Sequence, residues 1–101
     1  MSFAAFVNTH PEMLAAAAGS LHGIGSQLNA GNAAAAGPTS GVVPAAADVV
    51  SALTAAQFVA HAGSYQAVSA QAAAVHEMFV TTLQTSAASY AATEAANAAR
   101  V

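Results

Sequence analysis

The side chains that could do chemistry in this chain include four histidines and four carboxylates, with no cysteine. Without cysteine there is no thiolate nucleophile, no disulfide and no cysteine-type zinc site. His61 and His76 are fifteen residues apart, which on one helix separates them by roughly 22 Å, so they cannot share a metal ion. His22 and His61 could lie at a similar height across a helical hairpin, but two imidazoles without a nearby carboxylate make a poor site. We expect no metal and no cofactor.

The arrangements that enzymes use are also missing. There is no glycine-rich phosphate loop, no GxSxG and no pair of acids, and the adjacent His76 and Glu77 have no nucleophile placed to use them. Arg100 is the only basic residue and the net charge is −3. Nucleic acid is excluded as a partner, because binding phosphates needs several Lys or Arg residues, and anionic membrane surfaces are disfavoured. We predict a protein that is not an enzyme and binds no small-molecule substrate.

Long uncharged stretches dominate the sequence. Only 5% of the 101 residues are charged, and none lies between Glu12 and Asp48 or between Val49 and His76. The hydrophobic fraction is 56%, and its many alanines favour helix formation while removing little apolar area per residue from water. A helix that is apolar around most of its circumference is usually buried against other helices. The composition predicts one small all-α domain, spanning residues 1–101, that needs a partner.

Neither a membrane span nor a cleavable signal peptide is predicted. The uncharged segment 13–36 is long enough to cross ~30 Å of hydrocarbon. However, its glycine, serine, asparagine and glutamine residues are costly there, and no Lys or Arg flanks it. The segment 1–9 has no basic residue ahead of an apolar run, as a secretory signal peptide requires. Any export is expected to use another route.

Capping and turn residues predict two antiparallel helices joined by one turn. Thr9 and Glu12 have the spacing of a capping box, so the first helix is expected over about 9–36. Glycine and proline residues mark a turn at 37–44. The second helix is expected over about 45–97, with its last residues frayed.

Apolar residues recur along both predicted helices. In the first, Leu14, Leu21 and Leu28 repeat every seven residues, and Ala17 is placed between them in the contact with the second helix. In the second, residues at helical spacing form a longer stripe. This stripe consists of Leu53, Ala56, Ala60, Ser64, Val68, Ala72, Val75, Phe79, Leu83, Ser86 and Tyr90.

A partner is also expected from the register of the hairpin. If the turn centres near Ser40, Thr9 lies opposite Ala72, and the residues after Ala72 project beyond the first helix without an intrachain neighbour. A two-helix layer has no second face to cover such side chains. We therefore predict a partner that supplies two or three helices. Its contacts would be Leu14, Leu21, Ile24, Leu28, Leu53, Phe58, Val68, Val75, Met78, Phe79 and Leu83.

Several short motifs occur in a characteristic order around this hairpin. They are Met1-Ser2-Phe3 at the start, Pro11-Glu12 opening the first helix, VVPAAAD at 42–48, and Tyr90 with Glu94 spaced as YxxxE. With these motifs the sequence resembles the mycobacterial PE family over essentially its whole length. Pro-Glu lies a few residues further from the start than is usual in that family. The segment 4–10 is therefore slightly lengthened, which puts the fit of Phe3 and Phe6 to a partner in doubt.

The resemblance implies a function as well as a fold. PE domains pair with a PPE-family protein into an elongated four-helix bundle, which is exported folded through a type VII (ESX) secretion system. Tyr90 and Glu94 correspond to the family's general secretion signal, and four residues apart they share one helix face. The partner contributes a WxG motif close to this signal, and a chaperone of the EspG type binds the PPE protein.

The resemblance also predicts where the protein acts. It implies a short PE protein with no extension after Arg100, cytoplasmic before export and afterwards secreted or at the cell surface without a cleavable signal peptide. The alternative is a membrane-active or surface-associating apolar hairpin that acts alone.

Overall fold

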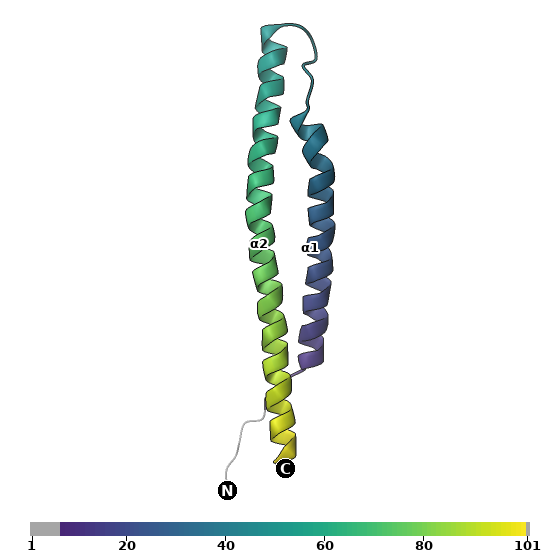
Figure 1. Ribbon diagram of the computed structural model, residues 1–101, viewed down its shortest axis with the longest axis vertical. Helices are drawn as coiled ribbons and strands as arrows, with labels where there is room; N and C mark the ends of the chain where they lie inside the picture. The colour runs from purple at the N-terminus through teal and green to yellow at the C-terminus, as the bar shows by residue number, and fades with distance from the viewer. Residues whose placement is uncertain (1–6, 101) are drawn as a thin grey trace.

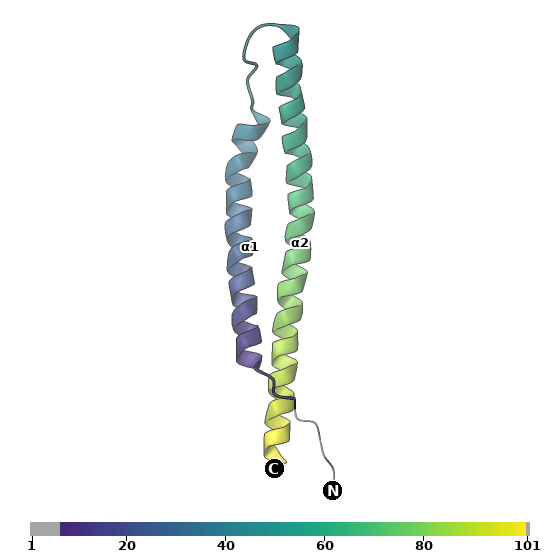
Figure 2. The same ribbon diagram turned by 180° about the vertical axis from the view of Figure 1, so that it is seen from behind.

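The protein is an elongated hairpin of two antiparallel helices (Figures 1 and 2). We analysed a computed structural model, which describes residues 7–100; the motif at residues 1–3, Phe6 and the last residue of the predicted domain lie outside this range. Helix α1 comprises Pro11–Ser40 and helix α2 comprises Val49–Ala99. The hairpin measures 84 × 22 × 14 Å, and α2 extends beyond α1 at both ends. The predicted all-α hairpin is confirmed.

The start of α1 differs from the predicted capping box. His10 is the N-cap residue, and its carbonyl accepts from the backbone N–H groups of Met13 and Leu14, 3.0 and 3.2 Å away. No side chain caps the helix. Thr9 lies one residue too early for its hydroxyl to cap this turn, and it bonds Glu94 instead. The predicted role of Thr9 as the cap is therefore wrong, whereas Pro11 does occupy the first turn.

Helix α1 ends at Ser40, four residues later than predicted, and it contains Pro38. Proline disfavours helical conformation in the preceding residue because of clashes with that residue's Cβ, and Gly37 has no Cβ. The hydroxyls of Thr39 and Ser40 donate to the carbonyls of residues 35 and 36, both at 2.6 Å. These bonds support the last turn beyond the proline.

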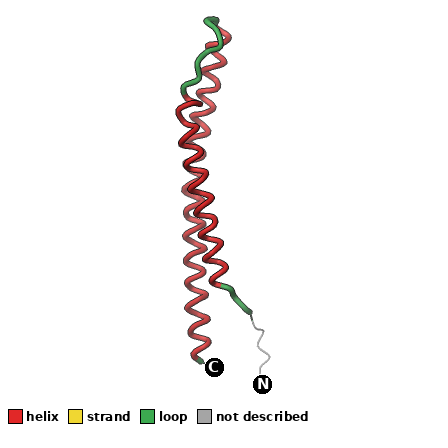
Figure 3. The backbone as a smooth tube through the Cα atoms, turned by 90° about the vertical axis from the view of Figure 1, so that its right-hand side faces the viewer, coloured by secondary structure: helices red, strands yellow, loops and turns green. Residues whose placement is uncertain are grey.

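The connection between the helices is an extended segment, visible as the loop at the far end of the hairpin (Figure 3). Helix α2 starts only at Val49, four residues later than predicted, and Pro44 belongs to the connection. Asp48 is the N-cap, and its carboxylate accepts from the backbone N–H and the hydroxyl of Ser51, at 2.8 and 2.9 Å. These bonds lower the pKa of Asp48.

The register between the helices is shifted from the predicted one. Asn32 lies opposite Tyr65 and Gln66, with which it forms hydrogen bonds of 2.8 and 2.9 Å. Thr9 lies opposite Glu94 and not Ala72. The prediction was wrong because the extended connection carries the start of α2 well past the end of α1.

One consequence is that the predicted overhang after Ala72 does not exist. Val80 is buried, and Leu83 is half-buried against α1. The part of α2 that passes the start of α1 is confined to its last turns (Figure 1).

The contact between the helices, here called the seam, has small residues at most of its buried positions. In α2 the less exposed positions recur at alternating steps of three and four residues, which is the spacing of a coiled coil. Ala18, at 0% exposure, faces α2, whereas Ala17 is exposed, so the predicted contact was displaced by one residue. The α1 seam comprises Pro11, Leu14, Ala18, Leu21, Gly25, Asn32 and Ala35; the α2 seam comprises Ala55, Val59, Ala62, Gln66, Ser69, Ala73, His76, Val80, Leu83 and Ala87.

Candidate partner-binding face and tyrosine motif

Large apolar side chains lie beside the seam, on one side of the hairpin. Three aromatic residues of α2 are separated by seven or fourteen residues: Phe58, Tyr65 and Phe79. Seven residues are close to two helical turns, so these side chains project in one direction. Tyr65 lines a groove together with Leu28 of α1, and Phe58 lines a second groove with Pro38 of α1. The two helices therefore contribute to one surface. We call it the apolar face: Ile24 and Leu28 of α1 with Phe58, Tyr65, Val68, Val75 and Phe79 of α2.

Most of the apolar face is open to solvent. The exposed fraction is 57% for Leu28, 60% for Phe58, 66% for Val75 and 53% for Phe79. The described core, in contrast, consists of four alanines and Val80. Each large side chain left exposed forgoes about 1.5 to 3 kcal/mol of burial free energy. The hairpin thus exposes more large apolar side chains than it buries.

Five of the predicted contact residues lie elsewhere. Leu14, Leu21 and Leu83 are half-buried in the seam. Leu53 and Met78 are 62% and 69% exposed, but each lies two residues before a buried seam residue. Two residues correspond to about 200° around a helix, so both side chains point away from α1. A partner covering the apolar face alone would leave Leu53 and Met78 uncovered.

The opposite side of the hairpin is hydrophilic. His22 Nδ1 lies 3.4 Å from Glu77 Oε1, with both side chains more than half exposed. Gln84 follows Glu77 by seven residues, and it lines a groove with Glu12 and Glu94. We call this side the polar face: Glu12, His22 and Asn29 of α1 with Glu77 and Gln84 of α2.

His22 and His61 do not lie opposite each other across the hairpin. His22 contacts Glu77 on the polar face, whereas His61 lines the groove of the apolar face beside Pro38 and Phe58. The shifted register separates the two imidazoles. No group of three or more histidine, aspartate or glutamate side chains within residues 7–100 is arranged to hold a metal ion.

His76 forms a polar link inside the seam. Its Nε2 lies 2.5 Å from the carbonyl oxygen of Leu21, so the ring crosses to α1. Gly25 makes room for it, because a Cβ at this position would lie 2.8 Å from two atoms of the imidazole. Sequence periodicity did not reveal this pair, since a glycine inside a helix shows no partner by itself.

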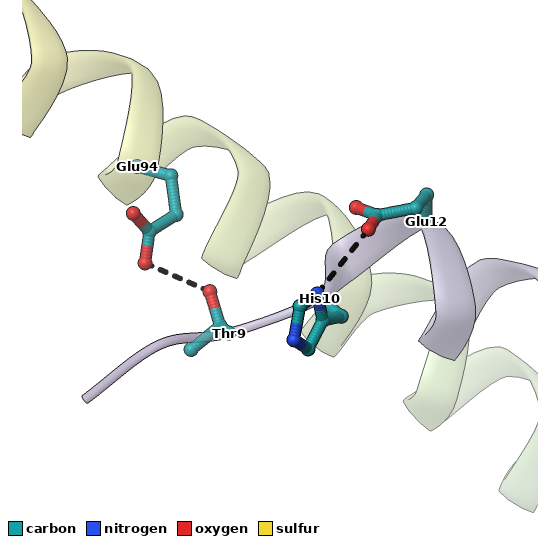
Figure 4. A network of polar contacts seen from close by, with 4 residues as sticks. All are labelled: Thr9, His10, Glu12 and Glu94. Carbon is teal, nitrogen blue, oxygen red and sulfur yellow. Dashed lines mark hydrogen bonds and ion pairs between the residues drawn. The ribbon is translucent and has the colours of Figure 1, made fainter.

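Tyr90 and Glu94 lie on one side of α2, as their spacing predicts. They continue the seam positions of α2 beyond Leu83 and Ala87, again at steps of three and four residues. Tyr90 is 48% exposed. The Thr9 hydroxyl donates to Glu94 Oε1 at 2.8 Å (Figure 4). Sequence reasoning did not pair Thr9 with Glu94, because the two are 85 residues apart.

Pro11 and Glu12 open α1 directly beside this site. Pro11 is half-buried in the seam, and Glu12 is exposed, with its Oε1 3.5 Å from His10 Nδ1 (Figure 4). Glu12 thus lies in the first turn, near the positive end of the helix dipole. The structure gives the dipeptide a helix-starting role.

In the described part of the chain, neither helix combines the length and hydropathy that crossing a bilayer requires. The segment 13–36 was predicted not to span a membrane, and this prediction is confirmed.

Known proteins with similar sequences place the chain in a family. The PE family model matches residues 7–97. The chain is 68% identical over 94 residues to PE family protein PE13 of Mycobacterium tuberculosis (strain ATCC 25618 / H37Rv), an alignment covering 93% of this chain and 95% of PE13. It is 61% identical over 94 residues to PE-PGRS family protein PE_PGRS33 of the same strain, covering 93% of this chain but 19% of that relative.

A third relative, PE family protein PE8 of the same strain, is 54% identical over 92 residues, which are 91% of this chain and 34% of PE8. PE_PGRS33 and PE8 are thus matched over a minor part of their length, and PE13 over nearly all of it. In this chain a helical hairpin with few charges, the Pro-Glu helix start and the tyrosine motif occur together. The chain belongs to the PE family, which has no known enzymatic activity.

Proposed function

We propose that this protein is the PE subunit of a heterodimer with a PPE-family protein, exported folded through a type VII secretion system. The observation that carries the proposal is the apolar face, with Phe58, Val75 and Phe79 each more than half exposed. Family membership supports the choice of a PPE-family protein as the partner.

The shape of the hairpin favours a helical partner. The apolar face contains residues from both helices, Ile24 and Leu28 in α1 and Phe58 to Phe79 in α2. At about 1.5 Å per residue, this surface is roughly 30 Å long, which matches two helices of a partner laid along the hairpin. The result is a four-helix bundle in which the apolar face becomes part of the core. The polar face, with Glu77 and Gln84, remains in solvent.

Export is assigned to Tyr90 and Glu94. Both side chains are exposed near the end of α2, away from the apolar face, so they remain accessible when a partner covers that face. Within the proposal they form the YxxxE secretion signal, and the chaperone contacts belong to the PPE protein.

Co-expression tests the pairing. The chain is produced alone and together with a candidate PPE-family protein, and each preparation is examined by size-exclusion chromatography, circular dichroism and thermal melting. The proposal expects a soluble one-to-one complex with cooperative melting, and an insoluble or non-cooperatively melting chain without the partner. A soluble, cooperatively melting monomer that ignores every PPE protein offered would contradict it.

The same preparations test the alternative of a hairpin that acts alone on lipid. Flotation with neutral phosphatidylcholine vesicles measures whether the isolated chain binds membranes. Binding by the isolated chain, together with failure to form a complex, would favour the alternative.

A further inference from the structure

Glu94 of the tyrosine motif lies beside the segment that leads into α1. Along α2 the seam positions Leu83 and Ala87 are followed at the same steps by Tyr90 and Glu94. Helix α1 begins only at Pro11, and Thr9, two residues earlier, bonds Glu94. Figure 4 shows this segment crossing beside α2, with the Thr9 side chain directed at Glu94.

Thr9 is the residue of this segment that contacts the motif. Its hydroxyl donates to Glu94 Oε1 at 2.8 Å, whereas the nearby His10 ring is directed to Glu12. The hydroxyl has no capping role, since the N-cap of α1 is His10. The Thr9–Glu94 contact therefore links the two ends of the sequence and does not cap α1.

The chemistry of this contact suits a carboxylate that another molecule must recognise. A free glutamate side chain samples several rotamers, and holding one of them costs conformational entropy. A hydroxyl bond to Oε1 favours one rotamer, while the carboxylate keeps further acceptor positions, including both lone pairs of Oε2. A donor from a receptor, such as an arginine or a backbone N–H, can then bind a carboxylate that is already oriented.

We propose that Thr9 is a positioning residue of the secretion signal, so that the signal comprises Thr9, Tyr90 and Glu94. This inference rests on the proposed function, because it assumes that Tyr90 and Glu94 are recognised during export. It adds a residue from the other end of the sequence to that signal.

The experiment measures export of the PE–PPE complex from a mycobacterium with an active type VII system. Thr9→Val removes the hydroxyl at nearly constant volume, and Thr9→Ser keeps it. Thr54→Val is the matched control, because the Thr54 hydroxyl bonds only its own helix at Val50, far from the motif. Tyr90→Ala and Glu94→Gln report on the proposed signal itself. Complex formation and melting temperature are measured for every variant.

The inference expects Thr9→Val to lower export about two- to tenfold, the range for losing one hydrogen bond. Thr9→Ser and Thr54→Val should export at the level of the unaltered protein, and all complexes should form and melt normally. Hydrogen exchange in the purified complex should be faster for the amides of residues 7–10 in Thr9→Val only.

Two results would overturn the inference and leave the proposed function intact. The first is normal export of Thr9→Val while Tyr90→Ala and Glu94→Gln are blocked. The second is loss of the complex itself in Thr9→Val, which would assign Thr9 to folding. Normal export of the Tyr90→Ala and Glu94→Gln complexes would instead remove the proposed signal, and the role of Thr9 with it.

Discussion

The seam and the apolar face are adjacent surfaces of the same two helices, yet they use opposite kinds of residue. Five of the six buried positions of the seam are alanine or glycine, among them Ala18 and Gly25. The apolar face has leucine, valine and phenylalanine, and more than half of the Phe58, Val68 and Val75 side chains is exposed. Most proteins bury their large apolar residues first. In this hairpin the small residues are used within the chain and the large ones remain available to a partner.

This division has a physical reason. Small side chains let the helix axes approach closely, but each removes little apolar area from water. The seam can therefore align the helices without supplying much free energy of folding. The larger contribution has to come from the apolar face, so we expect folding and partner binding to be coupled.

The largest effect is expected from a charge in the apolar face. Phe79→Asp places a carboxylate where the partner would bury an aromatic ring, and an unpaired buried charge costs about 3 to 5 kcal/mol. We expect the complex to be lost in co-purification with the PPE protein. Gln84→Asp is the matched control, because it adds a charge to the polar face and should leave the complex intact. Equal loss in both variants would show that the two faces do not differ in this way.

A large side chain in the seam should have the next largest effect. Ala18 is 0% exposed, and Ala18→Leu should push the helices apart at a cost of about 1 to 3 kcal/mol. The melting temperature of the complex measures this loss. Ala16→Leu is the control, since Ala16 is exposed and its substitution should change the melting temperature little. A neutral Ala18→Leu would mean that the seam lies elsewhere.

The sequence predicted the type of fold, but not how the two helices are placed against each other. Uncharged stretches and proline positions were enough to predict two helices, because these signals are local. The register depends on the conformation of the connection at 41–48, which periodicity does not encode. The seam was also displaced by one residue, from Ala17 to Ala18, because both alanines lie between Leu14 and Leu21 and the spacing of the leucines does not choose between them. The Thr9–Glu94 contact was missed for a related reason, because it appears only when the register is known.

A smaller effect is expected where His76 crosses the seam. In Gly25→Ala the added Cβ would lie 2.8 Å from the imidazole, so the ring or the helices must move, which costs about 1 kcal/mol or more. Gly23→Ala is the control, and it should change stability in the opposite direction, because no atom lies within 4 Å of a Cβ added at Gly23. There the higher helix propensity of alanine should stabilise α1 by about 0.5 to 1 kcal/mol. If Gly25→Ala and Gly23→Ala shifted the melting temperature in the same direction, the close approach of His76 to Gly25 would be contradicted.

The smallest effect concerns Asp48, the N-cap residue at which α2 begins. The hydrogen bonds from Ser51 lower the pKa of Asp48 from its usual value of 3.8. A carboxylate with a lowered pKa in the folded state stabilises that state above the unfolded-state pKa, and the stabilisation is lost as pH falls through the folded-state pKa. We therefore expect the protection factor of the Ser51 amide, the ratio of its exchange rate in the unfolded chain to that in the folded protein at the same pH, to fall as the pH drops below about 4, while amides in the middle of α2 remain protected.

Asp48→Asn separates the charge of this cap from its geometry. Asparagine caps helices as well as aspartate does but does not titrate, so the Ser51 amide should lose the pH dependence while keeping its protection near neutral pH. Hydrogen exchange measured between pH 6 and pH 3 in the complex gives both quantities. An unchanged pH dependence in Asp48→Asn would assign the effect to another carboxylate. Asp48 caps the first turn of α2, so loss of the cap should fray α2 at this end first. The seam around Ala18 and Val80 should still be formed at the same pH.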